Sequence, residues 1–331
     1  MITNPLATIP PLPALLAACL LYHGGAAAQP AASYPAKPIR IVIPFQVGGT
    51  NDIAARALAE QLALAFKQPV SVENRPGAGG LVGTEYVAKA PPDGYTLLVS
   101  NAGSLAAGFN LDAKAPYSVL TDFTPISLLS DVTIVLVVHP SVPARSVPEL
   151  IALARVRSGG LNAALPGVGT IEQLLTELFR QRTGIEIEAV PYKGGGRALV
   201  DLISGQADIS FISLPAANEL IKANRLKAIA VASARRSEQL PDVPTMGEAG
   251  RPDIVAAPWN AMLAPAATPR EVVIRLNAHV VRIMRTPEMK QSLGKKGVNP
   301  LWSTQEEAHA FIHDEIDRWA KVVKRAGNRL E

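Results

Sequence analysis

The sequence "IRIVIPFQVGGTNDIAARALAEQLALAF", residues 39–66, combines a short apolar segment, two adjacent glycines and a segment with helical spacing. Its first seven residues are mostly β-branched and apolar, which is typical of a buried strand. In the helix expected from about Asp52 to Phe66, Leu58 and Leu62 lie four residues apart and share one face. A strand that enters a glycine turn and then a helix is the first half of a βαβ unit.

The same rhythm repeats along the chain. "PVSVENR" (69–75) and "YTLLVS" (95–100) are the next expected strands, and "PGAGGLVGTEYVAKA" (76–90) supplies the glycine turn and helix between them. A second series of such units occupies residues 139–257, and helices dominate from residue 268 onward. We therefore predict an α/β fold with two α/β domains, parallel sheets covered by helices on both faces, and a ligand cleft between the domains.

Composition narrows the functional classes. The 331 residues are 48% hydrophobic and 18% charged, which argues against global disorder. The net charge is +4, but the basic residues occur in pairs such as Arg235-Arg236 and aromatic residues make up only 5%. We therefore expect no binding of nucleic acid.

The first 36 residues contain no Lys, Arg, Asp or Glu, and an apolar run leads to small residues at 26–28. This pattern predicts a signal peptide over residues 1–28 and export to the periplasm. Two alternatives remain open, namely a lipid anchor on Cys19 of the "LAAC" sequence (16–19) and retention in the cytoplasm. Because Cys19 is the only cysteine, a chain cleaved after Ala28 has neither a disulfide nor a thiolate metal site.

Several glycine turns each precede an expected helix, where free backbone N–H groups and the helix dipole favour an anion. No Lys-Ser or Lys-Thr pair follows the glycines, which argues against a P-loop. The glycines at 77 and 79 begin a dinucleotide fingerprint, but Val82 occupies its third glycine position. The turns therefore do not match these nucleotide loops, and a geometric role alone is the alternative for each of them.

The chain has no G-x-S-x-G nucleophile elbow. His309 and His313 lie four residues apart on an expected helix, which is compatible with a metal clamp but unspecific without a further ligand. We therefore expect no catalytic residue, no metal ion and no cofactor.

Seven motifs, taken in order, resemble the Bug-type receptors of the tripartite tricarboxylate transporter family. They are "PFQVGGTND", "VENRPGAGG", "APPDGYTLLVS", "VPYKGGG", "LISGQADISF", "LPDVPTMGEAG" and "LAPAATP". The match extends over essentially the whole chain after the leader. The resemblance implies a type II-like periplasmic binding protein whose two α/β domains are linked by two crossing strands. The domains would be residues 34–138 with 258–331, and residues 139–257.

The resemblance also implies that a small carboxylate lies in the cleft, with one carboxylate group held mainly by backbone amides and ordered water. Carried over by position, the ligand-binding residues are Gln46, Val47, Gly48, Gly49, Thr50, Asp52, Asn101, Ala102, Ser104, Gly169, Thr170, Gln173, Lys193 and Phe211. Structural roles stay open for four of them. Asp52 and Gln173 could cap helices, Ser104 could be a turn serine, and Phe211 could be a core residue.

The chain departs from the family pattern at Gln46, Leu105, Gln173 and Ile212, where Pro, His, His and Asp are common. The loss of the His and Asp polar groups, with Leu105 and Ile212 in two of their places, predicts a ligand whose distal part is neutral or apolar. The expected function is that of a monomeric solute receptor that delivers its ligand to membrane transporter subunits. The alternatives are a receptor that signals to a sensor protein and an enzyme acting on an organic acid.

Overall fold

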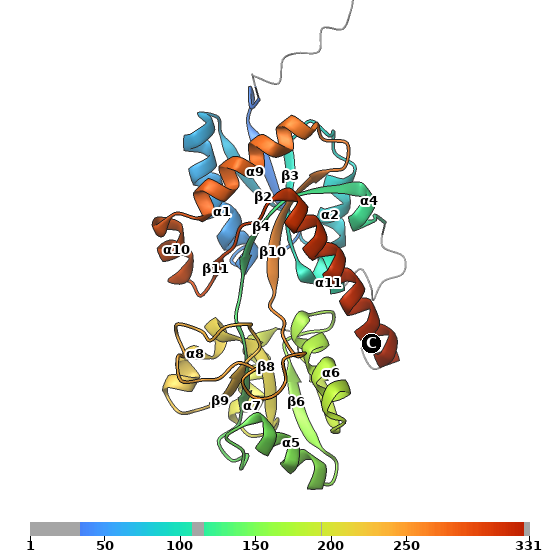
Figure 1. The fold of residues 1–331 in the computed structure, drawn as a ribbon, viewed down its shortest axis with the longest axis vertical. Coiled ribbons are helices and arrows are strands. Elements are labelled where there is room, and N and C mark those ends of the chain that lie inside the picture. Colours follow the sequence, from blue (N-terminus) through green and yellow to red (C-terminus); the bar gives the residue numbers. More distant parts are fainter. Residues whose placement is uncertain (1–33, 108–115, 193, 328–331) are drawn as a thin grey trace, which may run out of the picture. The chain divides into compact units, whose positions relative to one another are not determined.

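The computed structural model describes residues 34–107, 116–192 and 194–327, and residues 35–331 form one compact unit. The strands of this unit lie in two sheets, one with six strands and one with five (Figure 1). Each sheet together with the helices that cover it is called a lobe below. The expected signal peptide (1–28), Cys19 and Lys193 lie outside the described residues.

The first lobe is built on the sheet with the strand order β11-β4-β10-β3-β1-β2. The three strands β1, β2 and β3 are parallel, as the βαβ rhythm predicts, and Ile41 of β1 pairs with Val72 and with Leu97. Strand β10 runs antiparallel to both of its neighbours. The strands are β1 (Ile39–Ile43), β2 (Val70–Asn74), β3 (Thr96–Asn101), β4 (Phe123–Asp131), β10 (Trp259–Pro265) and β11 (Asn299–Pro300).

Helices from both ends of the chain cover the first sheet. Helix α1 packs against β1, β2 and α9, while α11 packs against β4 and against the helical turn η3. Side chains of α1 point into the core from Leu58, Leu62 and Phe66, the spacing seen in the sequence. The elements are α1 (Thr50–Phe66), η2 (Ala78–Gly80), α2 (Leu81–Ala88), η3 (Gly103–Ala107), α4 (Val119–Asp122), α9 (Arg270–Met284), α10 (Pro287–Gly294) and α11 (Gln305–Ala326).

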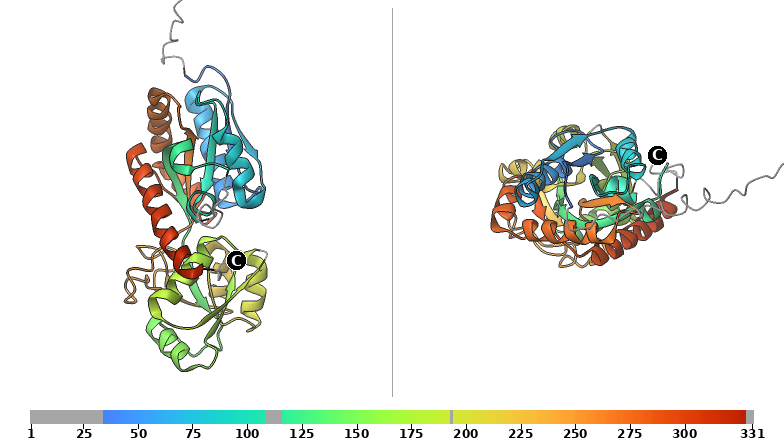
Figure 2. Two further views of the ribbon diagram at one scale, coloured as in Figure 1. Left: turned by 90° about the vertical axis from the view of Figure 1, so that its right-hand side faces the viewer. Right: turned by 90° about the horizontal axis from the view of Figure 1, so that it is seen from above.

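The second lobe is built on the sheet with the strand order β7-β6-β8-β5-β9. Helices α5 and α6 share one hydrophobic cluster with the sheet, and α7 and α8 share another, so that both faces of this sheet are covered (Figure 2). The strands are β5 (Ile134–Val138), β6 (Leu161–Leu165), β7 (Ile187–Pro191), β8 (Ile209–Ser213) and β9 (Lys227–Val231). The helices are α5 (Val147–Val156), α6 (Ile171–Thr183), α7 (Gly195–Ile203) and α8 (Leu214–Lys222).

The sheets are mixed, so the prediction of parallel sheets is wrong for part of each. Strand β4 leaves the first sheet, and the chain enters β5 of the second sheet after Val132 and Thr133. Strand β10 brings the chain back and runs antiparallel to β4. Outgoing and returning segments that lie side by side must point in opposite directions. Strand β5 in turn is antiparallel to its neighbours β8 and β9.

The position of β5 bears on the expected domain boundary. The predicted division placed residues 134–138 in the first domain, whereas β5 pairs only within the second sheet. We therefore propose that the first crossing lies at Val132 and Thr133, and the division into domains otherwise stays a prediction.

Helix α11 contacts both lobes. It packs on β4 of the first lobe and on α6 of the second, and Gln181 Nε2 donates to the carbonyl oxygen of Val322 at 3.1 Å. Its first turn has the predicted capping box, in which Thr304 and Glu307 satisfy each other's backbone N–H groups. None of the described helices is both long and apolar enough to cross a lipid bilayer.

Candidate ligand-binding site

The loop between β1 and α1, residues 44–49, is called the first glycine loop. Gly48 has a φ of +90°, a conformation that favours glycine. Its N–H donates to Asp52 Oδ2 at 3.0 Å, and this buried carboxylate also accepts from Arg56 Nε and Asn74 Nδ2, each at 3.0 Å. Burial opposes the ionisation of Asp52, but the hydrogen bonds from Arg56, Gly48 and Asn74 outweigh it and lower its pKa. The carboxylate thus locks the loop to the helix.

The amino end of α1 begins at a residue that has no side chain to cap the helix. Gly49 is the N-cap residue, and no side chain among the described residues caps the helix. The first N–H groups of a helix lack intrahelical partners and carry the positive end of its dipole. Asn51, which the sequence did not single out, is buried there. Its Oδ1 accepts from the Asp52 N–H at 3.0 Å, and its Nδ2 has no hydrogen-bond partner among the described residues.

The segment after β3, residues 101–107, is held by hydrogen bonds to other residues of the first lobe. Asn101 ends the strand, and its Oδ1 accepts from the Ser104 N–H at 3.3 Å. The Ser104 hydroxyl lies 2.5 Å from the Ser100 hydroxyl, and the Ser104 carbonyl accepts from the Tyr117 hydroxyl at 3.2 Å. Ala102 and Ser104 are buried. The Ser104 hydroxyl therefore has an internal partner in this structure.

The loop between β6 and α6, residues 166–170, is called the second glycine loop. It repeats one hydrogen bond of the first loop but differs at the helix cap, since the Thr170 side chain caps α6. Gly169 has a φ of +73°, and its N–H donates to Gln173 Oε1 at 2.7 Å. The Thr170 hydroxyl accepts from the Gln173 N–H at 3.2 Å and donates to the Gly167 carbonyl at 3.0 Å. In both loops a glycine with positive φ thus donates to a side chain four residues further on.

Close backbone approaches connect these segments. A Cβ at Gly80 would lie 2.9 Å from Phe45 Cζ and 3.1 Å from Ser104 Cβ, so η2 packs directly between the first glycine loop and η3. A Cβ at Gly103 would lie 3.8 Å from the carbonyl oxygen of Gly169. The structure therefore brings η3 of the first lobe beside the second glycine loop.

The other two predicted positions are Phe211 and Lys193. Phe211 is fully buried on β8, and its ring makes an edge contact with Phe179 at a centroid distance of 5.6 Å. Lys193 lies outside the described residues, although its neighbour Tyr192 is fixed by a 2.6 Å hydrogen bond from its hydroxyl to Asp201. Phe211 thus contributes to the core in this structure.

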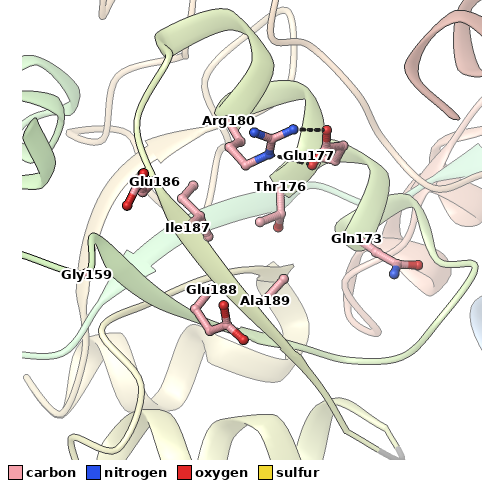
Figure 3. A pocket seen from close by; sticks show the side chains of 9 residues that line it. All are labelled: Gly159, Gln173, Thr176, Glu177, Arg180, Glu186, Ile187, Glu188 and Ala189. Atoms are coloured by element: carbon pink, nitrogen blue, oxygen red, sulfur yellow. Dashed lines mark hydrogen bonds and ion pairs between the residues drawn. The ribbon is translucent and has the colours of Figure 1, made fainter. Parts of the chain in front are cut away.

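A groove of about 470 Å³ lies between α6 and β7 (Figure 3). It is lined by Gly159, Gln173, Thr176, Glu177, Arg180, Glu186, Ile187, Glu188 and Ala189. Inside it the Arg180 guanidinium pairs with Glu177 at 2.6 Å. Among the residues that the structure describes, Gln173 is the one predicted ligand residue that lines the groove.

Among the residues that the structure describes, no group of three or more His, Cys, Asp or Glu side chains is placed to hold a metal ion. Of the histidine pair considered above, His313 Nδ1 lies 3.8 Å from Asp317 Oδ2 on the same helix. That spacing is typical of a polar helix face.

Comparison with known proteins agrees with the resemblance seen in the sequence. Residues 54–328 match the family described as the tripartite tricarboxylate transporter family receptor. The Protein BugT of Bordetella pertussis is 42% identical over 309 residues, which cover 93% of this chain and 95% of BugT.

Solved structures of the same kind share the fold. R. palustris Rpa4515 with adipate is 36% identical, with a TM-score of 0.76 over 89% of this chain and 98% of that one. The periplasmic binding protein BugD is 32% identical, with a TM-score of 0.72 over 89% of this chain and 99% of BugD. MatC from Rhodopseudomonas palustris with bound malate is 31% identical, with a TM-score of 0.71 over 88% of this chain and 100% of MatC.

These matches confirm the α/β fold of periplasmic binding proteins and the predicted family. They also confirm the prediction of a receptor over that of an enzyme. The chain therefore belongs to the family of tripartite tricarboxylate transporter receptors.

Proposed function

We propose that this receptor binds a small organic carboxylate at the two glycine loops and presents it to the membrane subunits of a tripartite tricarboxylate-type transporter. The observation that carries the proposal is the amino end of α1, where Gly49 leaves the helix without a side-chain cap while Asp52 is occupied inside the loop. The adipate and malate of the two related structures support the ligand class.

The second glycine loop supplies the opposite side of the proposed site. It approaches η3 at Gly103, and its own backbone is fixed by Gln173. A ligand that contacts both loops would stabilise an arrangement with the lobes closed around it, because its binding energy is available only when both loops are in reach.

The proposal is tested by thermal and chemical unfolding of the protein in the presence of mono- and dicarboxylates. A ligand at 100 times its dissociation constant should raise the free energy of unfolding by about 2.7 kcal/mol. Gly49→Val should abolish this effect, since the new side chain would stand at the amino end of α1 and displace Asn51 Oδ1, which would lie 2.9 Å from its Cβ.

Gly294→Val, at the end of α10, is the matched control because a Cβ there meets no atom within 4 Å. It should leave ligand stabilisation unchanged. If no carboxylate stabilises the refolded wild-type protein, the proposed ligand class is wrong. If Gly49→Val binds as well as wild type, the site is wrong.

The proposal also includes the export of the protein, its oligomeric state and its lack of affinity for nucleic acid. We expect residues 1–28 to direct the chain to the periplasm and to be removed after Ala28. Mass spectrometry of the protein from a periplasmic fraction tests this, and a lipid-modified Cys19 or an intact leader would contradict it. We also expect a monomer without affinity for nucleic acid, which light scattering and a gel-shift assay test directly.

A further inference from the structure

Two exposed valines occupy equivalent places in the two glycine loops. Val47 precedes Gly48 and is 69% exposed, and Val168 precedes Gly169 and is 55% exposed. Single apolar side chains on a surface are ordinary and carry little weight by themselves. These two valines occupy equivalent positions in their loops. The glycine that follows each valine has positive φ and donates its N–H to a side chain four residues after that glycine.

The acidic side chains near these valines do not offer a partner to a cationic ligand group. The Asp52 carboxylate already accepts from Gly48, Arg56 and Asn74. Glu172, which follows the second glycine loop, is half-buried, and burial raises its pKa. An ammonium group would thus meet one occupied carboxylate and one whose charged form is disfavoured.

Two polar groups near the second glycine loop are also engaged within the protein. Gln173 Oε1 accepts from the Gly169 N–H, and the Ser104 hydroxyl is paired with Ser100. A ligand hydroxyl pressed against the valine methyl groups would lose its hydrogen bonds to water without replacement, which is costly. A methylene group at the same place gains from burial.

We propose that Val47 and Val168 contact the hydrocarbon part of the ligand and make the receptor selective for unsubstituted aliphatic acids over their 2-hydroxy and 2-amino analogues. This inference rests on the proposed function, since it takes the carboxylate site at the glycine loops as given. The two valines are specificity-determining residues of that site.

The test compares matched acids by isothermal titration calorimetry on the whole protein. The pairs are succinate with malate, glutarate with 2-hydroxyglutarate, and adipate with 2-hydroxyadipate, and the pair whose unsubstituted member binds most tightly is used. Wild type should prefer the unsubstituted acid by about tenfold or more. Val47→Thr with Val168→Thr keeps the side-chain shape but adds two hydroxyls, and should reduce the preference to about threefold or less.

Val156→Thr is the control, because Val156 is 84% exposed at the end of α5 and lies in neither loop. It should keep the wild-type preference. A wild-type preference for the hydroxylated acid, or an unchanged preference in the double variant, would overturn the inference while carboxylate binding stands. If the folded wild-type protein binds neither the six acids nor any other carboxylate, the proposed function is wrong, and the inference that rests on it is wrong as well.

Discussion

Asp52 and Gln173 perform the same task in different lobes, although one is charged and the other is neutral. Each accepts the N–H of a glycine with positive φ and holds a loop against the first turn of a helix. From sequence alone both residues could equally contact a ligand, because the choice depends on where the glycine N–H points. That direction follows from φ angles that the sequence permits but does not dictate.

The charge of Asp52 makes its role visible in the pH dependence of stability. Asp52→Asn should lower the free energy of unfolding at pH 7 by about 1 to 3 kcal/mol, since it replaces an acceptor of several hydrogen bonds by a group that also donates. The folded pKa of Asp52 lies below the ordinary value of 3.8. Its stabilisation is therefore present above about pH 4 and is lost as pH falls through the folded pKa.

Urea unfolding of both proteins at pH 7 and at about pH 3 measures this difference. The gap between wild type and Asp52→Asn should narrow at the lower pH. Asp242→Asn, at an exposed position, serves as the control and should change little at either pH. Equal stability of Asp52→Asn and wild type at pH 7 would contradict the locking role.

Helix α11 contacts both lobes, and the buried side chain of Glu315 connects it to strand β10. Glu315 Oε2 accepts from the indole N–H of Trp259 at 3.0 Å and from that of Trp319 at 2.9 Å, while Oε1 accepts from Arg318 at 3.2 Å. Trp259 begins β10, so this cluster joins the last helix to the second crossing between the lobes.

Removal of the Glu315 carboxylate should lower the stability of the fold. Glu315→Leu leaves two buried indole N–H groups without an acceptor and should lower the free energy of unfolding by about 2 to 4 kcal/mol. Glu315→Gln retains one acceptor oxygen and should lose less. Denaturant unfolding followed by tryptophan fluorescence measures both variants, and a Glu315→Leu variant as stable as wild type would show that the cluster does not hold the helix.

The elements also show what the sequence could and could not predict. Apolar spacing located α1 and its buried face, and the Thr304–Glu307 pair located the start of α11. Strand β10 was not among the expected strands. Its antiparallel direction could not have been predicted either, because the local pattern of a strand is the same whether its neighbour runs parallel or antiparallel. Only the path of the whole chain, out through β4 and back through β10, decides that direction.

For the whole molecule, we propose that the two lobes act as one receptor, because each carries a loop in which a glycine with positive φ donates to a side chain four residues further on. The motifs that carry the family resemblance include the first glycine loop but not the second. They are spread along the chain from residue 44 to residue 269, which is why fold and receptor class could be predicted from sequence. The ligand could not be predicted, since in our proposal it depends on side chains such as Val47 and Val168, whose exposure is a property of the folded loops.

A crystal structure of the protein with adipate tests the proposed site most directly. We predict one carboxylate group at the amino end of α1, within hydrogen-bond distance of the backbone N–H groups of Gly49 and Thr50, with Asp52 still bound to Gly48. Adipate lying in the groove between α6 and β7, with the first glycine loop empty, would contradict the proposal.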